Sequence, residues 1–256
     1  MDLKVYTLIS SSSGNSIFFR YKSIAFLIDA GRSMKVIKQN LEAIGESLDS
    51  ISAIFVTHEH SDHIKAIPMI KKHYPDIPVI IPKACYIYSN LASDIVTPYT
   101  NSLCMRCRDE DITVCSIKTS HDSADSVGYV ISTPEGNIGI CTDTGYIPEE
   151  SFKKLASCKG VLIESNYDEK MLACGSYPPE LKDRIRSNRG HLSNDYASKC
   201  VETLCRYGTE NFLLCHLSEE NNTPEAAYSN AKKILSENSL SPSIKVAQKD
   251  KPTSLF

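Results

Sequence analysis

A short segment near residue 60 holds the side chains best suited to chemistry in this chain of 256 residues. The segment HEHSDH begins at His58 and directly follows an apolar run, SAIFVT. Alternate side chains of an extended stretch point the same way, so His58 and His60 can converge on one ion. Asp62 and His63 diverge, and a turn into the next helix would carry both to a second ion. Imidazole and carboxylate without thiolate suit zinc, manganese or iron, which favours a metal centre over exposed histidines on a polar loop.

The elements that must hold this segment follow from the hydrophobic periodicity. Strands are predicted over 3–9, 16–21, 24–29, 52–57, 112–119, 126–133, 137–142, 160–164 and 212–215. Helices are predicted over 33–44, 65–74, 148–157 and 194–207, with a last helix that begins at Thr223-Pro224-Glu225. The polar run 10–15 is expected to form a loop. This order favours an α/β (α+β) fold, a four-layer αββα sandwich, and without repeats or linkers we expect a single domain over residues 1–256.

Composition and charge restrict the class of protein and its partners. The chain has 41% hydrophobic and 23% charged residues, as ordinary globular proteins do. Its net charge of −3 and pI of about 6.2 mean that a nucleic acid must be met by a local basic patch. No apolar stretch approaches the roughly 20 residues needed to span a bilayer, and the first residues do not resemble a signal peptide. We therefore expect a cytoplasmic protein with no membrane partner.

The ten cysteines are expected to be reduced thiols. Six of them lie within apolar runs, where a free thiol behaves as a small hydrophobe: Cys115, Cys141, Cys158, Cys200, Cys205 and Cys215. Cys104 and Cys107 form the only C-x-x-C pair. A structural zinc site normally needs a second such pair, so this one is not expected to bind metal.

The HEHSDH segment resembles the signature of the metallo-β-lactamase superfamily, and later segments resemble the family's other motifs in order along almost the whole chain. The resemblance implies seven metal ligands: His58, His60, Asp62, His63, His121, Asp143 and His216. It also implies that Asp143 bridges two ions and that Asp29 supports a ligand by hydrogen bonding. Taken singly, Asp29 or Asp143 would only shape a turn before a glycine, and His121 or His216 would be a buried imidazole.

His191, in the segment RGHLSN, resembles the accessory histidine of the phosphodiesterase and nuclease branches of this superfamily. That resemblance implies contact with the scissile phosphate or help to the leaving group; the alternative is that His191 braces its loop. Asp143 stands where many zinc β-lactamases have Cys, and His60 stands where the oxygen-reducing di-iron relatives have Glu. Only 47 residues separate Asp143 from His191, so a β-CASP insertion is not expected.

Segments around SSSGNS, LIDAG, ESN and GHLSN resemble the YycJ (WalJ)-like branch, which is associated with exonuclease activity on DNA. Residues expected to support the ligands or to contact substrate are Asp29, Ser13, Asn15, Glu164, Ser165, Asn194 and Arg189. Arg189 ends a basic stretch that also contains Lys182, Arg184 and Arg186. Such a stretch neutralises phosphates or forms a solvated helix face.

The resulting hypothesis is hydrolysis of a phosphodiester by a hydroxide held between two divalent ions, zinc or manganese, with iron also accepted. Asp62 and His191 are the expected catalytic residues. DNA is the favoured substrate, and the resemblance implies 5′ to 3′ cleavage and a role in DNA repair. The alternative enzyme acts on a small thioester, lactone or cyclic phosphodiester with the same metal pair. A metal-binding regulatory module without turnover is the alternative from another class.

Overall fold

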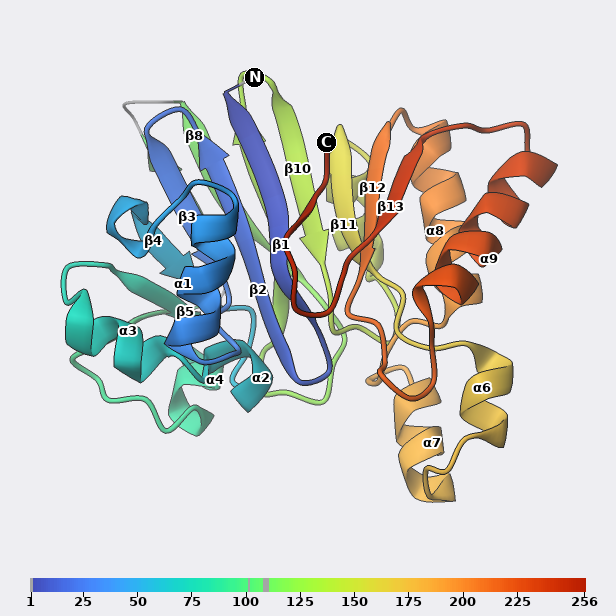
Figure 1. The fold of residues 1–256 in the computed structure, drawn as a ribbon, viewed down its shortest axis with the longest axis horizontal. Coiled ribbons are helices and arrows are strands. Elements are labelled where there is room, and N and C mark those ends of the chain that lie inside the picture. The colour runs from blue at the N-terminus through green and yellow to red at the C-terminus, as the bar shows by residue number, and fades with distance from the viewer. Residues whose placement is uncertain (1, 101, 108–110) are drawn as a thin grey trace.

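Two seven-stranded sheets lie face to face in the computed structural model (Figure 1), which describes residues 2–100, 102–107 and 111–256. The strands of the first sheet are, in spatial order, β14 (Thr253–Ser254), β1 (Leu3–Ser11), β2 (Gly14–Tyr21), β3 (Ile24–Ile28), β4 (Ala53–Phe55), β5 (Val79–Pro82) and β6 (Thr97–Tyr99). Those of the second are β13 (Ser243–Val246), β12 (Asn211–Cys215), β11 (Gly160–Glu164), β10 (Gly136–Cys141), β9 (Val127–Thr133), β8 (Ile112–Lys118) and β7 (Cys104–Cys107).

Helices cover the outer faces of both sheets. The helices beside the first sheet are α1 (Met34–Ala43), α2 (Ser61–Ile64), α3 (Ile67–His73) and α4 (Lys83–Tyr88), and a 3₁₀ turn covers Leu48–Ser50. Those beside the second are α5 (Glu149–Leu155), α8 (Asn194–Arg206) and α9 (Pro224–Glu237), while α6 (Glu169–Cys174) and α7 (Pro179–Arg186) project beyond it. Ser193 and Thr223 cap α8 and α9 through their hydroxyls, which accept backbone amides of the first turn. No helix in the described part of the chain is both long and apolar enough to cross a bilayer.

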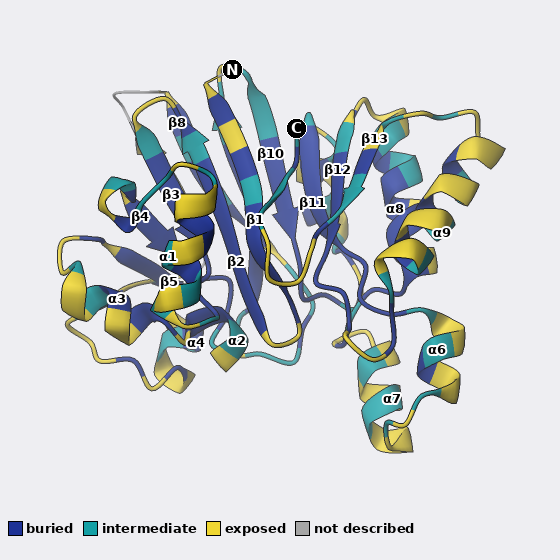
Figure 2. Ribbon diagram, in the orientation of Figure 1, coloured by how far each residue is buried: buried dark blue, intermediate teal, exposed yellow. Residues whose placement is uncertain are grey.

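Apolar side chains form three layers of core between these elements. One core lies between the two sheets and includes Phe26, Phe55 and Tyr129. The ring centroids of Phe26 and Phe55 are 5.1 Å apart, and those of Phe55 and Tyr129 are 5.6 Å apart. A second core joins the first sheet to α1 and α3, and a third joins the second sheet to α8 and α9. The central strands are accordingly buried on both faces (Figure 2). The predicted αββα sandwich is confirmed.

The predicted loop over residues 10–15 is wrong, because the strands continue into it. Ser10 pairs with Asn15 and Ser11 with Gly14, after a register shift between Thr7 and Ile9. Only a two-residue turn remains. The elements that the periodicity did not predict are short: β5, β6, β7, β13, β14, α2, α4, α6 and α7. Runs of this length carry too few apolar repeats to show a period.

The expectation that Cys104 and Cys115 are free thiols is also wrong. Strands β7 and β8 pair antiparallel with Cys104 opposite Cys115, and the two residues form a disulfide. Direct opposition across two strands brings side chains within bonding reach, which a sequence does not reveal without the strand register. The side chain of Cys107 lies outside the described part of the structure. The other five cysteines that lie within apolar runs are free thiols: Cys141, Cys158, Cys200, Cys205 and Cys215.

Candidate metal centre

The candidate site lies at the edge where several strands end. Asp29 follows β3, Asp143 follows β10 and His216 follows β12, and all three have a left-handed backbone, with φ of 64°, 55° and 56°. Strand β3 is parallel to β4, and β10, β11 and β12 are parallel to one another, so their carboxyl ends meet at this edge. Non-glycine residues adopt positive φ at a cost of about 1–3 kcal/mol, which persists where surrounding contacts fix it. The backbone is therefore held in place for these three side chains.

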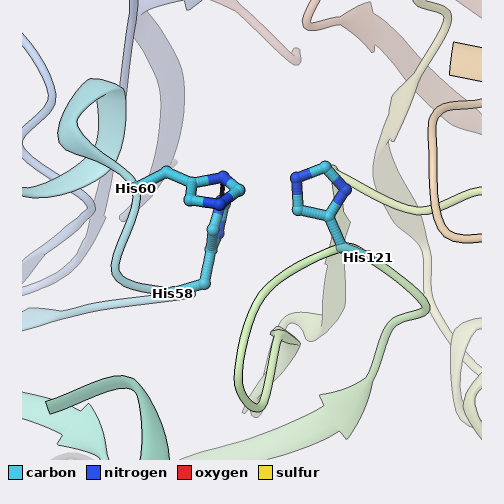
Figure 3. Close-up of side chains that lie close together, drawn as sticks. All are labelled: His58, His60 and His121. Atoms are coloured by element: carbon cyan, nitrogen blue, oxygen red, sulfur yellow. Dashed lines mark hydrogen bonds between the residues drawn. The ribbon is translucent and has the colours of Figure 1, made fainter. Parts of the chain in front are cut away.

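Three imidazoles form one half of the site (Figure 3). His58 and His60 extend from the loop after β4, His121 extends from a facing loop, and one nitrogen of each lies within 4.8 Å of the others. The His58 Nε2 and His60 Nδ1 atoms are 3.1 Å apart. The Nδ1 atom of His121 lies 3.2 Å from the carbonyl oxygen of Gly190, which leaves Nε2 toward the other two rings. Burial lowers the pKa of His58 well below its usual value, so this imidazole is neutral, the form that binds metals.

Two carboxylates and two further imidazoles form the other half. The Nε2 atom of His63 lies 3.2 Å from Asp62 Oδ2 and 3.5 Å from Asp143 Oδ2. The Nε2 atom of His216 lies 3.3 Å from Asp143 Oδ1. The same Oδ1 atom is 3.9 Å from His121 Nε2, so Asp143 stands between the two halves. We call these seven residues, four in this half and three in the first, the His/Asp cluster.

Asp143 provides the test of whether the cluster suits a metal. Its side chain is buried, and its Oδ2 atom accepts no hydrogen bond. Burial opposes its ionisation, but the imidazoles of His216 and His63 hold its pKa well below the usual value. A buried, charged oxygen without a hydrogen bond is costly unless a cation satisfies it. Nitrogen and carboxylate donors around such an oxygen fit a divalent transition metal.

Hydrogen bonds from residues outside the cluster fix the orientation of its side chains. The Asp29 Oδ2 atom lies 2.7 Å from His63 Nδ1 and accepts the Thr57 hydroxyl at 2.8 Å, while Oδ1 accepts the Thr57 amide at 2.8 Å. Asn15 donates to Asp62 Oδ2 at 3.1 Å, and its Oδ1 lies 3.0 Å from His216 Nδ1. Asp29 and Asn15 thus hold side chains of the His/Asp cluster by hydrogen bonds from outside it.

A buried acid holds His191 beside the cluster. Glu164, at the end of β11, is fully buried, and its Oε1 lies 2.5 Å from His191 Nδ1. Its Oε2 accepts the amide of Thr144 at 3.0 Å, which fixes the carboxylate. Burial alone would lower the pKa of His191, but Glu164 overrides it and raises the pKa to about 9. The His191 ring lies 5.0 Å from that of His121, so a protonated imidazole borders the His/Asp cluster.

The cluster opens into a cavity of about 310 Å³. Its polar wall includes His60, Asp62, Asp143, His191 and His216. A second part of the wall is formed by residues before and within α7: Tyr177, Leu181, Arg184 and Ile185, which we call the α7 wall. A substrate in this cavity would touch both the chemistry-bearing residues and a partly apolar surface.

The other four residues that were expected either to support the ligands or to contact substrate also do not line this cavity: Ser13, Ser165, Asn194 and Arg189. The Ser13 hydroxyl instead donates to Glu219 at 2.8 Å, and Ser12 lines the cavity in its place. Ser165 donates to Asn194 Oδ1 at 2.7 Å, inside a buried network. Arg189 donates from Nε to the carbonyl oxygen of His121 at 3.2 Å, so it braces a histidine loop.

Several supporting residues lie outside the set of expected site residues, although Asn166 belongs to the ESN segment whose other two members were in that set. Asn166 donates to the carbonyl oxygen of His216 at 2.8 Å, and Ser10 accepts the His216 amide at 2.7 Å. Asn222 donates to the carbonyl oxygen of Ser165 at 2.8 Å. Asp122 lies 3.2 Å from His121 Nε2 and pairs with Arg184. Asn166 and Asp122 each lie within two residues of a predicted site residue, and that adjacency was the available signal.

Known proteins resemble this chain in both sequence and fold. Residues 25–217 match the family model described as beta-lactamase superfamily domain. The chain is 31% identical to the exodeoxyribonuclease YycJ of Bacillus anthracis over 93% of this chain and 90% of that protein. It is 32% identical to the exodeoxyribonuclease WalJ of Streptococcus pneumoniae (strain D39) over 88% and 85%.

A solved structure extends the likeness to the whole fold. The metallo-beta-lactamase fold protein YhfI of Bacillus subtilis superposes with a TM-score of 0.73 over 98% of this chain and 99% of that one, at 14% identity. The chain thus belongs to the beta-lactamase superfamily as a YycJ-like member, and it is a metal-dependent hydrolase.

Proposed function

We propose that this protein is an exonuclease that hydrolyses phosphodiester bonds of DNA with two divalent metal ions in the His/Asp cluster. The observation that carries the proposal is the placement of His191, which Glu164 keeps protonated at the border of the cluster, in the wall of the cavity. The two exodeoxyribonuclease relatives match along most of the chain and support DNA as the substrate. We further propose 5′ to 3′ cleavage, a role in DNA repair and a cytoplasmic location.

The metal ions are proposed to occupy two positions that share Asp143. His58, His60 and His121 would hold one, and Asp62, His63 and His216 would hold the other. Zinc or manganese suits this donor set, and iron is accepted by the same ligands. Bound divalent ions supply Lewis acidity, which makes a nucleophilic hydroxide available near neutral pH and offsets charge on the phosphoryl oxygens.

The protein's own residues supply proton transfer and alignment. Glu164 forms a hydrogen bond with Nδ1 of His191. The proton on the other ring nitrogen, Nε2, is therefore free to be donated to the leaving oxygen. Asp62 is partly exposed at the cavity, where its carboxylate can orient the attacking water. Asp29 keeps His63 in one orientation, and Asn15 spans from Asp62 to His216, so this half of the cluster keeps its shape between turnovers.

The test is a panel of single- and double-stranded DNA and RNA, labelled at the 5′ or the 3′ end and assayed with manganese and with zinc. We expect metal-dependent release of mononucleotides from the 5′ end of DNA. Hydrolysis of a thioester or lactone without any polynucleotide would contradict the proposal. Ordered release from the 3′ end would contradict only the polarity.

A further inference from the structure

One face of α7 points toward the cavity and not toward the core. Leu181, Arg184 and Ile185 are spaced i, i+3 and i+4, so they share one helix face, and all three line the cavity. No residue of α7 is buried. Tyr177 lines the same cavity just before the helix begins. The α7 wall therefore presents an aromatic ring, two aliphatic side chains and one cation to whatever occupies the cavity.

This wall is held in place. Arg186 pairs with Glu169 of α6 at 3.2 Å, and Lys182 donates to the carbonyl oxygen of Ala173 at 2.9 Å, which joins the two helices. Arg184 pairs with Asp122, the residue after His121. The wall is therefore linked directly to the loop that carries a member of the His/Asp cluster.

We propose, on the basis of the proposed function, that the α7 wall is a nucleobase subsite. The occupant follows from continuity: a phosphodiester at the His/Asp cluster places the base of an adjoining nucleotide against the other wall of the same cavity. The base stacks on Tyr177 and is enclosed by Leu181 and Ile185, while Arg184 faces the phosphate backbone. Rings and aliphatic groups recognise the face of a base and not its hydrogen-bonding edge, so the subsite accepts every base.

The experiment is a cycle that removes the ring and the base separately. The substrates are single-stranded DNA oligonucleotides with natural ends, and the same oligonucleotides with an abasic residue at each of the three terminal positions in turn. The enzymes are wild type, Tyr177→Ala, Tyr177→Phe and the control Tyr207→Ala, whose tyrosine is 68% exposed outside the cavity. KM and kcat are measured, and thermal melting checks that each variant is folded.

We expect Tyr177→Ala to raise KM for natural ends at least about fivefold, because base stacking contributes roughly 1–3 kcal/mol per base. Tyr207→Ala retains the wild-type KM, and Tyr177→Phe, which keeps the ring, recovers most of the increase in KM seen in Tyr177→Ala. At one terminal position, removing the base raises the wild-type KM by a similar factor, and the two losses are not additive. Additive losses would refute the subsite. So would a wild-type KM that is the same for every abasic substrate as for natural ends. The subsite is also refuted if the wild-type enzyme hydrolyses small phosphodiesters but no DNA. If the wild-type enzyme hydrolyses no phosphodiester at all, the proposed function itself is refuted.

Discussion

The two walls of the cavity differ in how their residues are held. In the His/Asp cluster, His58 and His63 are fully buried, and Asp143 and His216 follow strand ends with left-handed backbone. In α7, by contrast, every residue is at least partly exposed, as the colours of Figure 2 show. Ion pairs, one lysine hydrogen bond and the hydrogen bond from the His191 amide to the Ile185 carbonyl oxygen hold α7, whereas the centre of the cluster rests on buried strands.

This difference separates two tasks. Electrostatic groups that act on developing charge work best when they need no rearrangement, and burial in a fixed backbone provides that. A surface that receives successive nucleotides must admit and release them, which suits accessible side chains on a short helix. Substitutions in the cluster should therefore affect metal content and turnover, and substitutions in the α7 wall should affect KM.

The largest effect is expected for Asp143→Ala. Both metal positions are proposed to share this carboxylate, so metal content should fall from two ions per chain toward none. Activity should fall by roughly a thousandfold or more, since bound metals supply several kcal/mol of transition-state stabilisation. Elemental analysis after dialysis and a DNA hydrolysis assay measure the two quantities. The control is Asp76→Ala, an exposed residue outside the site, and two tightly bound ions in Asp143→Ala would refute the shared position.

His191→Ala should come next, with a loss in kcat of about 10²–10⁴-fold, the usual range for a general acid. Metal content should remain at the wild-type value, because His191 is proposed to carry a proton and not a metal. His73→Ala, which changes an exposed histidine of α3, is the matched control. Loss of metal from His191→Ala would assign this side chain to the ligands instead.

Glu164→Gln should change the pH dependence. Glu164 raises the pKa of His191 to about 9, so the protonated form predominates at neutral pH and is lost as the pH rises through 9. Without the carboxylate, burial lowers this pKa, and the falling limb of kcat moves to lower pH. At pH 8 the loss should be roughly ten- to thirtyfold, since each pKa unit changes the protonated fraction tenfold. A pH profile unchanged from wild type and from Glu237→Gln would disprove this coupling.

The smallest effect is expected for Arg184→Ala. Arg184 is largely exposed in its pair with Asp122, and pairs that reach solvent contribute about 0–1 kcal/mol, so the melting temperature should hardly change. KM for DNA should rise a few-fold, and the salt dependence of KM should weaken by about one phosphate contact. Arg206→Ala, on α8, is the control. A melting temperature lowered by many degrees would instead show that α7 is part of the folding core.

Local spacing explains what the sequence could predict. HEHSDH follows an apolar run, so the strand end and the clustering of His58 and His60 were both visible. The αββα order followed in the same way from long, periodic strands and helices. The placement of Asp143 and His216 beside them depended on the resemblance to a family, because no local spacing connects these segments.

Long-range register explains what the sequence could not predict. Glu164 and His191 meet across 27 residues of separation, and only the fold brings them together. The shift between Thr7 and Ile9 changes the register of β1 and β2, and Ser12 lines the cavity in place of Ser13. Helix α7 buries none of its residues, so it has no core-facing period to detect.

The central claim is that imidazoles and carboxylates from both halves of the chain hold two cations around Asp143. Anomalous diffraction at the metal edge, from crystals grown with zinc or manganese, tests it most directly. We expect two peaks, one among His58, His60 and His121 and the other among Asp62, His63 and His216, with Asp143 in contact with both. A single peak, or an ion held by Glu164, His191 and His216, would contradict the account.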